Sequence, residues 1–285
     1  MNRRMFLRLS GAAALMPSVG FGIEPLKPLA VTRHVVDVGL ERPFRILHVS
    51  DSHIARIDSR DGDALYAYAR KRSRIGREMG EYYLDEAVAY ARQRGLKIVH
   101  TGDLADFASV ANLEYAERRF ATDDFLPCVG NHEYWTAGAN RAQETEDYKA
   151  RTLPQVKRAF SAIPCRTVAL GGLNFLVFDN AFDDVTEPVV TAFEDAVRQG
   201  LPIVLVCHVP FALTGVDNSL ACGAPSSRSN VLTRAFVERV RREPLVKAIL
   251  CGHVHCPETD RFSPTAMTYV AGANYLGDVS RIDFA

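Results

Sequence analysis

The chain has 285 residues, of which 47% are apolar and 24% are charged, a composition typical of folded globular proteins and unlike that of disordered chains. Lys and Arg together number 34, as do Asp and Glu, so the net charge is zero and no basic field indicates a nucleic-acid partner. Solenoid and propeller folds are excluded because the sequence shows no fixed-period repeat.

The N-terminal segment differs from the rest of the chain. Arg3, Arg4 and Arg8 precede the uncharged stretch 9–23, which is the order of charge and apolarity in a secretory signal. The string N-R-R-M-F-L-R resembles the twin-arginine export signal. The stretch is too short to span a membrane, so no stable transmembrane segment is expected. We expect an export signal over 1–22, recognised by the export machinery, and a periplasmic location in a bacterium. A basic N-terminus on a cytosolic protein is the alternative.

Six short runs rich in Val, Ile, Leu or Phe recur along the chain. Each is too short for a helix and has the nearly continuous apolar character of a strand buried on both faces. The runs are 44–49, 96–100, 125–129, 174–178, 203–207 and 246–251. Amphipathic helical patterns lie between several of them, at 84–91, 113–120, 193–197 and 232–240. Strands that alternate with helices predict an α/β fold with helices covering the sheet, and 268–284 has the pattern of closing strands.

Punctuating residues support the helix limits. Gly95 and Gly200 stand where a helix C-terminus favours glycine, and Ser229 or Asn230 precedes the last helical pattern as an N-cap. Residues 23–42 are interpreted as a linker or edge segment, and 43–285 as a single domain. Two polar stretches, 55–77 and 213–229, do not follow the alternation of strands and helices. Each is interpreted either as a functional loop or as a solvated excursion.

Polar side chains of one kind follow five of the predicted strands. They occur in Ser50-Asp51-Ser52-His53, Thr101-Gly102-Asp103, Gly130-Asn131-His132-Glu133, His208, and Gly252-His253-Val254-His255. Since ligands bind outside the carboxyl ends of the strands in an open α/β sheet, these residues are expected to converge on one crevice. His48 and His100 lie inside strand runs and are interpreted as core histidines.

The crevice would contain two carboxylates, one amide and five imidazoles, without thiolates. This mixture suits Mn, Fe or Zn better than Ca. A four-ligand zinc site would leave several side chains unused, so two metal ions are expected. Asp103 is the natural bridge between them because a carboxylate offers two oxygens.

The ordered series D-x-H, G-D, G-N-H-E, H and G-H-x-H, from Asp51 to His255, resembles the calcineurin-like metallophosphoesterases. The resemblance implies a four-layer fold of two packed mixed β-sheets flanked by α-helices. It implies one metal held by Asp51, His53, Asp103 and His255, and another held by Asp103, Asn131, His208 and His253. His132 would be the catalytic residue that orients the phosphate or protonates the leaving group.

The expected activity is metal-dependent hydrolysis of a small phosphate ester, with a phosphodiester favoured. A hydroxide that bridges the metals would attack phosphorus in line with the leaving oxygen. A phosphomonoesterase and a nucleotide-conjugate pyrophosphatase are the alternative enzymes. An inactive metal-containing binding protein is the alternative of another class.

Five further residues near the motifs are additional candidates, and four of them have two interpretations each. Glu133 is either a partner of His132 or a solvent-facing glutamate. Asp106 and Asp179 either orient a ligating histidine or, for Asp106, cap a helix, which we favour. Tyr134 and Trp135, the only tryptophan, either contact the substrate or anchor local packing. The arginines of 55–77 either meet a second phosphate or form a solvated face.

The six cysteines contain no C-x-x-C pair, so a zinc finger or thioredoxin-like site is not indicated. Cys128, Cys207 and Cys251 each end an apolar run and are interpreted as small buried apolar residues. Cys165, Cys222 and Cys256 are candidates for a disulfide in an oxidising compartment.

Overall fold

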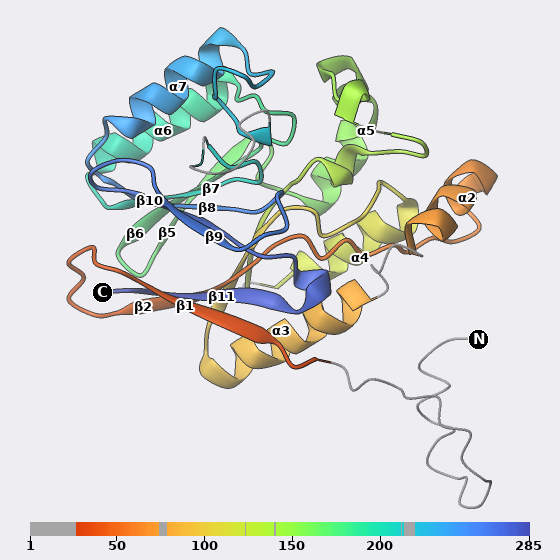
Figure 1. Ribbon diagram of the computed structural model, residues 1–285, viewed down its shortest axis with the longest axis horizontal. Helices are drawn as coiled ribbons and strands as arrows, with labels where there is room; N and C mark the ends of the chain where they lie inside the picture. Colours follow the sequence, from red (N-terminus) through yellow and green to blue (C-terminus); the bar gives the residue numbers. More distant parts are fainter. Residues whose placement is uncertain (1–26, 74–78, 123, 140, 212, 214–219) are drawn as a thin grey trace, which may run out of the picture.

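The computed structural model describes residues 27–73, 79–122, 124–139, 141–211, 213 and 220–285, and they form two β-sheets that pack on one another (Figure 1). The first sheet has the order β1 (Ala30–Val36), β11 (Asp278–Phe284), β2 (Phe44–Val49), β3 (Lys97–Thr101) and β4 (Phe125–Cys128). The second has the order β5 (Cys165–Leu170), β6 (Leu173–Phe178), β7 (Ile203–Val206), β8 (Val246–Cys251), β10 (Met267–Val270) and β9 (Glu258–Arg261). The six predicted strand runs are therefore confirmed, within one residue at each end.

Both sheets are mixed, as expected, and each contains a run of parallel strands. In the first sheet β2, β3 and β4 are parallel neighbours, whereas β11 pairs antiparallel with β2. In the second sheet β6, β7 and β8 are parallel, and the outer pairs β5–β6 and β10–β9 are antiparallel. Parallel neighbours end at the same edge of a sheet, so the loops that follow β2, β3 and β4 leave the first sheet side by side.

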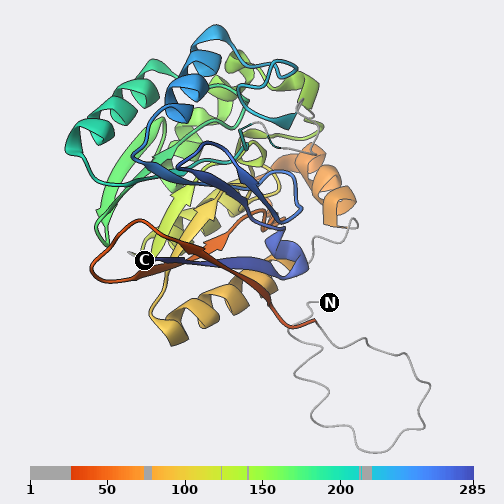
Figure 2. The same ribbon diagram turned by 60° about the vertical axis from the view of Figure 1, so that its left-hand side comes forward.

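Helices cover the outer faces of the two sheets. Figures 1 and 2 show α3 (Gly80–Arg94) below the first sheet, and α6 (Glu187–Gln199) with α7 (Val231–Arg241) above the second. Residues of α3, α4 (Val110–Phe120) and α5 (Glu146–Ala159) join a core cluster with β2 and β3, and α6 and α7 join one with the second sheet. A third cluster, between the sheets, includes Ile46, Val99, Phe175, Val204 and Leu250. The four-layer α/β sandwich is therefore confirmed.

The helix limits follow the residues that the sequence singles out. Gly95 and Gly200 end α3 and α6 in the left-handed conformation, with φ of 61° and 74°, which glycine adopts at little steric cost. Asn230, rather than Ser229, caps α7 by accepting a hydrogen bond from the backbone N–H of Thr233.

The polar stretch 55–77 contains a helix that its pattern did not predict. In the described part of this stretch, α2 (Gly62–Ser73) packs on the domain through Leu65 and Ala69, which contact Phe107. A single turn-spaced apolar pair is too weak a pattern to stand out against the surrounding charges. α5 also escaped prediction: it contains Pro154, and its buried face includes Lys149 and Thr152.

The remaining expectations have mixed outcomes. The predicted export signal lies outside the described residues. Among the described helices, none is both long and apolar enough to cross a membrane. Cys128, Cys207 and Cys251 are buried as expected, and all six cysteines are free, so the candidate disulfide is not formed. β1 lies at the edge of the first sheet.

Candidate metal centre

The loops after five strands bring the predicted metal ligands together. Asp51 and His53 follow β2, Asp103 follows β3, and Asn131 follows β4 on the first sheet; His208 follows β7, and His253 and His255 follow β8 on the second. Five of these side chains are less than 4% exposed, namely Asp51, His53, Asp103, Asn131 and His208. The crevice therefore lies where the carboxyl ends of both sheets meet.

The first group of ligand atoms comprises Asp51, His53, Asp103 and His255, the set implied for one metal. Nε2 of His53 lies 2.9 Å from Nε2 of His255 and 3.7 Å from Oδ2 of Asp103. Oδ1 of Asp51 lies 3.2 Å from Nε2 of His255. Four donor atoms on four different side chains thus face one small volume.

The second group surrounds the other side of Asp103 and includes His208 and His253. Nε2 of His208 lies 3.2 Å from Oδ2 of Asp103, 3.0 Å from Oδ1 of Asn131 and 3.3 Å from Nδ1 of His253. All four residues of the second implied set are therefore neighbours. Asp103 belongs to both groups, as a bridging ligand must.

Hydrogen bonds behind the site fix which ring nitrogen faces inward. Nδ1 of His53 donates to Oδ1 of Asp106 at 2.8 Å, and Nδ1 of His208 donates to the backbone oxygen of Thr101 at 2.8 Å. A proton on Nδ1 leaves the Nε2 lone pair of a neutral imidazole free to bind a metal. In both histidines Nε2 therefore keeps the free lone pair that a metal ligand requires.

The backbone of these loops is strained. Among the described residues, six other than glycine have φ between 47° and 73°, and five of them are Asp51, His53, Asp103, His253 and His255. Left-handed residues with a Cβ are costly and persist only where the surrounding structure enforces them, most often at functional sites. The strain therefore marks the same residues as the sequence motifs.

Glycines let the ligand loops approach one another closely. A Cβ on Gly130 would lie 2.2 Å from Oδ1 of Asp103, and one on Gly252 would lie 2.4 Å from Oδ2 of Asp51. These two positions accept no larger residue without moving a carboxylate.

The electrostatics of the crevice suit cations. Oδ1 of Asp51 is buried and makes no hydrogen bond within the described chain, although Nε2 of His255 is close by. Burial alone would lower the pKa of His208, but the carboxylates of Asp103 and Asp51 raise it to about 10. Burial would raise the pKa of Asp103, but His208, His132 and His53 hold it well below its usual value. The residues therefore fit metal ions, and their nitrogen and oxygen donors suit Mn, Fe or Zn.

A family model described as calcineurin-like phosphoesterase matches residues 44–257, which include every one of these candidate ligands. The chain belongs to the calcineurin-like phosphoesterase family. It is therefore a hydrolase of phosphoric esters with a dinuclear metal centre, as the sequence predicted.

Comparison with solved structures gives distant likenesses. A dimetal phosphatase from Danio rerio is 12% identical, with 81% of this chain and 88% of that chain covered and a TM-score of 0.49. A phosphopantetheinyl hydrolase from Mycobacterium tuberculosis is 15% identical, with 85% and 91% covered and a TM-score of 0.40. A 5′-nucleotidase from Candida albicans is 12% identical with a TM-score of 0.42; 88% of this chain is covered but only 47% of that one. No curated protein sequence matches the chain. Likenesses this weak carry no substrate over to this phosphoesterase.

Asp106 joins the metal site rather than capping a helix. Its carboxylate accepts from His53 and lies 3.3 Å from Nδ1 of His132, whereas α4 is capped by Ser109. The helix-cap interpretation that we favoured was wrong because Ser109 stands closer to the first turn and accepts from Asn112. Arg72 of α2, which no motif indicated, also binds Asp106.

Glu133 and Asp179 do not contact a ligating histidine through any hydrogen bond found in the described chain. Glu133 is fully buried, and it accepts from the backbone N–H groups of Asp103, Ala105 and Gly130. It therefore holds two ligand loops together, and both of its sequence interpretations were wrong. Asp179 accepts from the hydroxyl of Tyr134 and pairs with Lys149, behind the site.

The two aromatic candidates, Tyr134 and Trp135, differ in burial and in the groups that they contact. Tyr134 is fully buried with its hydroxyl on Asp179, so it anchors packing and cannot meet a substrate. Trp135 is half-buried, and its ring centroid lies 3.9 Å from that of His132 at an interplanar angle of 31°. Tyr275, which no sequence motif indicated, lies edge-on to His255 with centroids 5.5 Å apart. Trp135 and Tyr275 are thus the aromatic rings beside the imidazoles.

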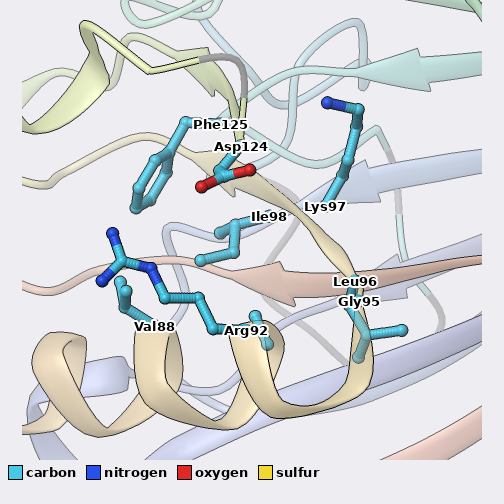
Figure 3. Close-up of a pocket in the computed structure, with 9 residues that line it drawn as sticks. Val88, Arg92, Gly95, Leu96, Lys97, Ile98, Asp124 and Phe125 are labelled. Atoms are coloured by element: carbon cyan, nitrogen blue, oxygen red, sulfur yellow. The ribbon is translucent and has the colours of Figure 1, made fainter.

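Another cavity, of about 330 Å³, opens where β3 and β4 begin rather than where they end (Figure 3). Val88, Arg92 and Leu96 line it together with Lys97, Asp124 and Phe125. None of its lining residues belongs to the metal-ligand groups, so we place the chemistry at the opposite edge of the sheet.

Proposed function

We propose that Asp51, His53, Asp103 and His255 bind one metal ion, that Asp103, Asn131, His208 and His253 bind the other, and that the centre hydrolyses a phosphodiester. One observation carries the assignment: Oδ2 of Asp103 lies 3.7 Å from Nε2 of His53 and 3.2 Å from Nε2 of His208. A carboxylate between two such groups is suited to bridge two cations. When bound, the cations activate the attacking water and offset charge that develops on the phosphate oxygens.

His132 is suited to protonate the leaving oxygen. Its Nδ1 donates to the backbone oxygen of Asp106 at 2.9 Å, and its Nε2 lies 4.0 Å from Oδ2 of Asp103, so Nε2 faces the crevice. A proton on Nε2 would pass to the oxygen that leaves phosphorus. Oδ1 of Asp106 also lies 3.3 Å from Nδ1 of His132, so this side of the ring is held in place while Nε2 faces the crevice.

The phosphodiester preference rests on the motif spacing, which resembles that of single-domain family members that cleave diesters. The side of the crevice beside Trp135 is where we place an aromatic leaving group. Trp135 is half-buried and lies beside the proton donor, which supports this position because an indole can stack on another aromatic ring.

The test is hydrolysis of a chromogenic phosphodiester and a chromogenic phosphomonoester by the full-length protein. Untreated, chelated and Mn-reloaded samples would be compared with Asp103→Asn, which keeps the shape of the bridge but removes its charge. We expect turnover that chelation abolishes, that Mn restores, and that the variant lacks. Faster cleavage of the diester supports the proposal, and faster cleavage of the monoester replaces it with a phosphomonoesterase.

Two other results would contradict the proposed activity in different ways. Two bound metals without turnover of either ester would favour a pyrophosphatase, which nucleotide-conjugate substrates would then reveal, or an inactive binding protein. A wild-type chain that binds no Mn, Fe or Zn would overturn the ligand assignment itself.

We also propose that residues 1–22 direct export to the periplasm through the twin-arginine machinery. The support is the sequence pattern of Arg3 and Arg4 before the uncharged stretch. Replacing both arginines by lysine keeps the charge and should hold the protein in the cytoplasm of the host, as fractionation would show. Unchanged export would contradict the proposal.

A further inference from the structure

Glu144 is a buried carboxylate whose two oxygens bind three side chains. Its side chain is 2% exposed. Oε1 accepts from Nδ2 of Asn131 at 3.0 Å and from Nε1 of Trp135 at 3.1 Å. Oε2 accepts from Nη2 of Arg228 at 2.5 Å. One side chain outside every sequence motif thus touches both a proposed metal ligand and the aromatic wall of the crevice.

The contact with Asn131 decides which end of the amide faces the second metal position. An ionised carboxylate only accepts hydrogen bonds, so it selects the NH₂ group of the amide. The carbonyl oxygen is then directed to the other side, where Oδ1 of Asn131 lies 3.0 Å from Nε2 of His208. An amide turned the other way would present hydrogen atoms to a cation.

The contact with Trp135 fixes the indole against the proposed proton donor. The indole N–H is only a donor, and Oε1 of Glu144 accepts it while the ring lies over His132. The same oxygen therefore sets the orientation of Asn131 and the position of Trp135.

Arg228 supplies the positive charge that a buried carboxylate requires. It also contacts Oδ2 of Asp183 at 3.3 Å. Asp183 is buried and has φ of 68°, and it is the remaining left-handed residue besides the five proposed ligands and the described glycines. Its backbone oxygen accepts from the hydroxyl of Ser229, next to Arg228. Strain of this kind persists where surrounding contacts enforce it, so the residue that pairs with Arg228 is itself held in place by its surroundings.

We propose that Glu144 is a positioning residue of the metal centre, which directs the carbonyl oxygen of Asn131 to the second metal and holds Trp135 on His132. Occupancy of that metal position and the environment of Trp135 are therefore coupled. The inference rests on the proposed function for the role of Asn131 as a ligand. The hydrogen bonds that carry it do not depend on which ester is cleaved.

The test uses the single tryptophan of the chain, whose emission reports on this site alone. The full-length wild type, Glu144→Leu and Glu144→Gln would be titrated with Mn²⁺, with bound metal per chain and Trp135 emission recorded together. Glu243→Leu is the matched control, because Glu243 is also buried and pairs with an arginine, Arg239, but contacts no proposed ligand.

We expect Glu144→Leu to bind the second Mn²⁺ about 10- to 100-fold more weakly, as is usual when a group that orients a ligand is lost. The emission wavelength of metal-free Glu144→Leu should differ from that of the metal-free wild type, because the indole N–H loses its charged acceptor. Glu144→Gln keeps an oxygen acceptor but loses the charge, so its second Mn²⁺ should bind roughly 3- to 10-fold more weakly. Glu243→Leu should match the wild type in both readouts.

Wild-type affinity for two Mn²⁺ ions and wild-type emission in Glu144→Leu would overturn the inference while leaving the proposed function intact. If that variant does not fold, Glu144→Gln decides: affinity and emission equal to those of Glu243→Leu would overturn it. A wild type that binds no Mn²⁺ would instead contradict the proposed function, and the emission of the metal-free variants would still test the contact with Trp135.

Discussion

Arg72 makes a two-point hydrogen bond with Asp106, in which Nε donates to Oδ2 and Nη2 donates to Oδ1, both at 2.6 Å. Asp106 also contacts His53 and His132, so the guanidinium reaches the metal site through one carboxylate. Burial alone would raise the pKa of Asp106, but the hydrogen bonds from His132 and His53 hold it well below its usual value. Helix α2 therefore contributes to the site although it carries no ligand.

Replacing Arg72 with methionine should lower kcat about 10- to 100-fold, because Asp106 then loses its fixed position behind both imidazoles. Arg72→Lys should be intermediate, since an ammonium cannot donate to both oxygens in the same planar geometry. Steady-state kinetics on a chromogenic ester would measure both. Arg60→Met is the matched control: Arg60 pairs with Asp58 and Glu114 at the surface, and its loss should change kcat less than about twofold. Equal kcat values for Arg72→Met and Arg60→Met would contradict the role of Arg72.

Gly102 lies so close to the ring of His208 and to the backbone of Gly130 that a side chain at this position would clash with both. Its φ is 99°, and a Cβ would lie 2.6 Å from Nδ1 of His208 and 2.8 Å from the nitrogen of Gly130. Gly138 has a similar φ of 78°, but a Cβ there would meet no atom within 4 Å. Gly138→Ala should therefore cost only the backbone strain, about 1–2 kcal/mol of unfolding free energy.

Gly102→Ala should cost about 1–3 kcal/mol more than Gly138→Ala, because the methyl group must displace His208. It should also weaken metal binding, since the bond from Nδ1 of His208 to Thr101 holds that ring as a ligand. Denaturant unfolding and metal content would be measured for both variants. Equal losses of stability and full metal content in both would show that His208 tolerates the displacement.

Removal of the metals should destabilise the fold. Asp51 and Asp103 are buried. Within the described residues, their carboxylates lie beside histidines of the two ligand groups, His255 and His208. A ligand that binds only the folded chain adds about 4 kcal/mol per site at a thousandfold excess over its dissociation constant. Calorimetry should therefore show a lower Tm after chelation, with a smaller drop in Asp103→Asn. An unchanged Tm in the wild type would mean that the site binds metals too weakly to matter for folding.

The sequence predicted well which side chains converge on the crevice, because their pattern is local. Each ligand directly follows an apolar run, and the carboxyl ends of parallel strands must meet at one edge. Asp103 and His255 could therefore be placed in one crevice although 152 positions separate them in the sequence. The buried strands β2 and β8 were equally evident from continuous apolar runs.

The groups behind the ligands could not be predicted in the same way. Arg72, Glu144 and Tyr275 reach the site from α2, from the loop before α5 and from the short helix before β11. None of the three side chains belongs to one of the strand-end motifs. Only the tertiary fold brings these side chains to the candidate metal site, so no spacing or periodicity in the sequence predicts their role. Asp106 was misjudged for a related reason: its position before a helix suited a cap, and only the fold shows Ser109 in that role.

Acid should destabilise the protein through His48 and His100. Both are fully buried, and burial lowers the pKa of His48 to about 3 and that of His100 to about 4. Below pH 6.5 the unfolded chain binds protons at these rings while the folded chain does not, so stability falls as the pH drops toward 4. Each ring contributes a slope of up to about 1.4 kcal/mol per pH unit.

The slope can be assigned by substitution. Denaturant unfolding of metal-free wild type and His48→Leu between pH 4 and 7 should show a smaller loss of stability with falling pH in the variant, because the variant lacks one of the two rings. Parallel curves would mean that His48 takes up a proton in the folded state. Its only described side-chain partner is the hydroxyl of Thr101, which accommodates a neutral ring.

Trp135 and Tyr275 flank the imidazoles, and this placement predicts a preference for aromatic leaving groups. Trp135 stacks on His132, and Tyr275 lies edge-on to His255, so a planar group bound between them would contact at least one ring. Such contacts contribute about 0.5–1.5 kcal/mol each beyond simple burial.

Trp135→Leu should therefore raise KM for an aryl phosphodiester by roughly 3- to 10-fold, with KM for a short alkyl diester nearly unchanged. Because any disturbance of His132 would affect both esters, the ratio of the two KM values isolates the contact with the leaving group. Tyr275→Leu measures the other ring in the same way. An equal rise in KM for both esters would show that Trp135 acts on His132 alone, and an unchanged ratio in both variants would place the leaving group away from the two rings.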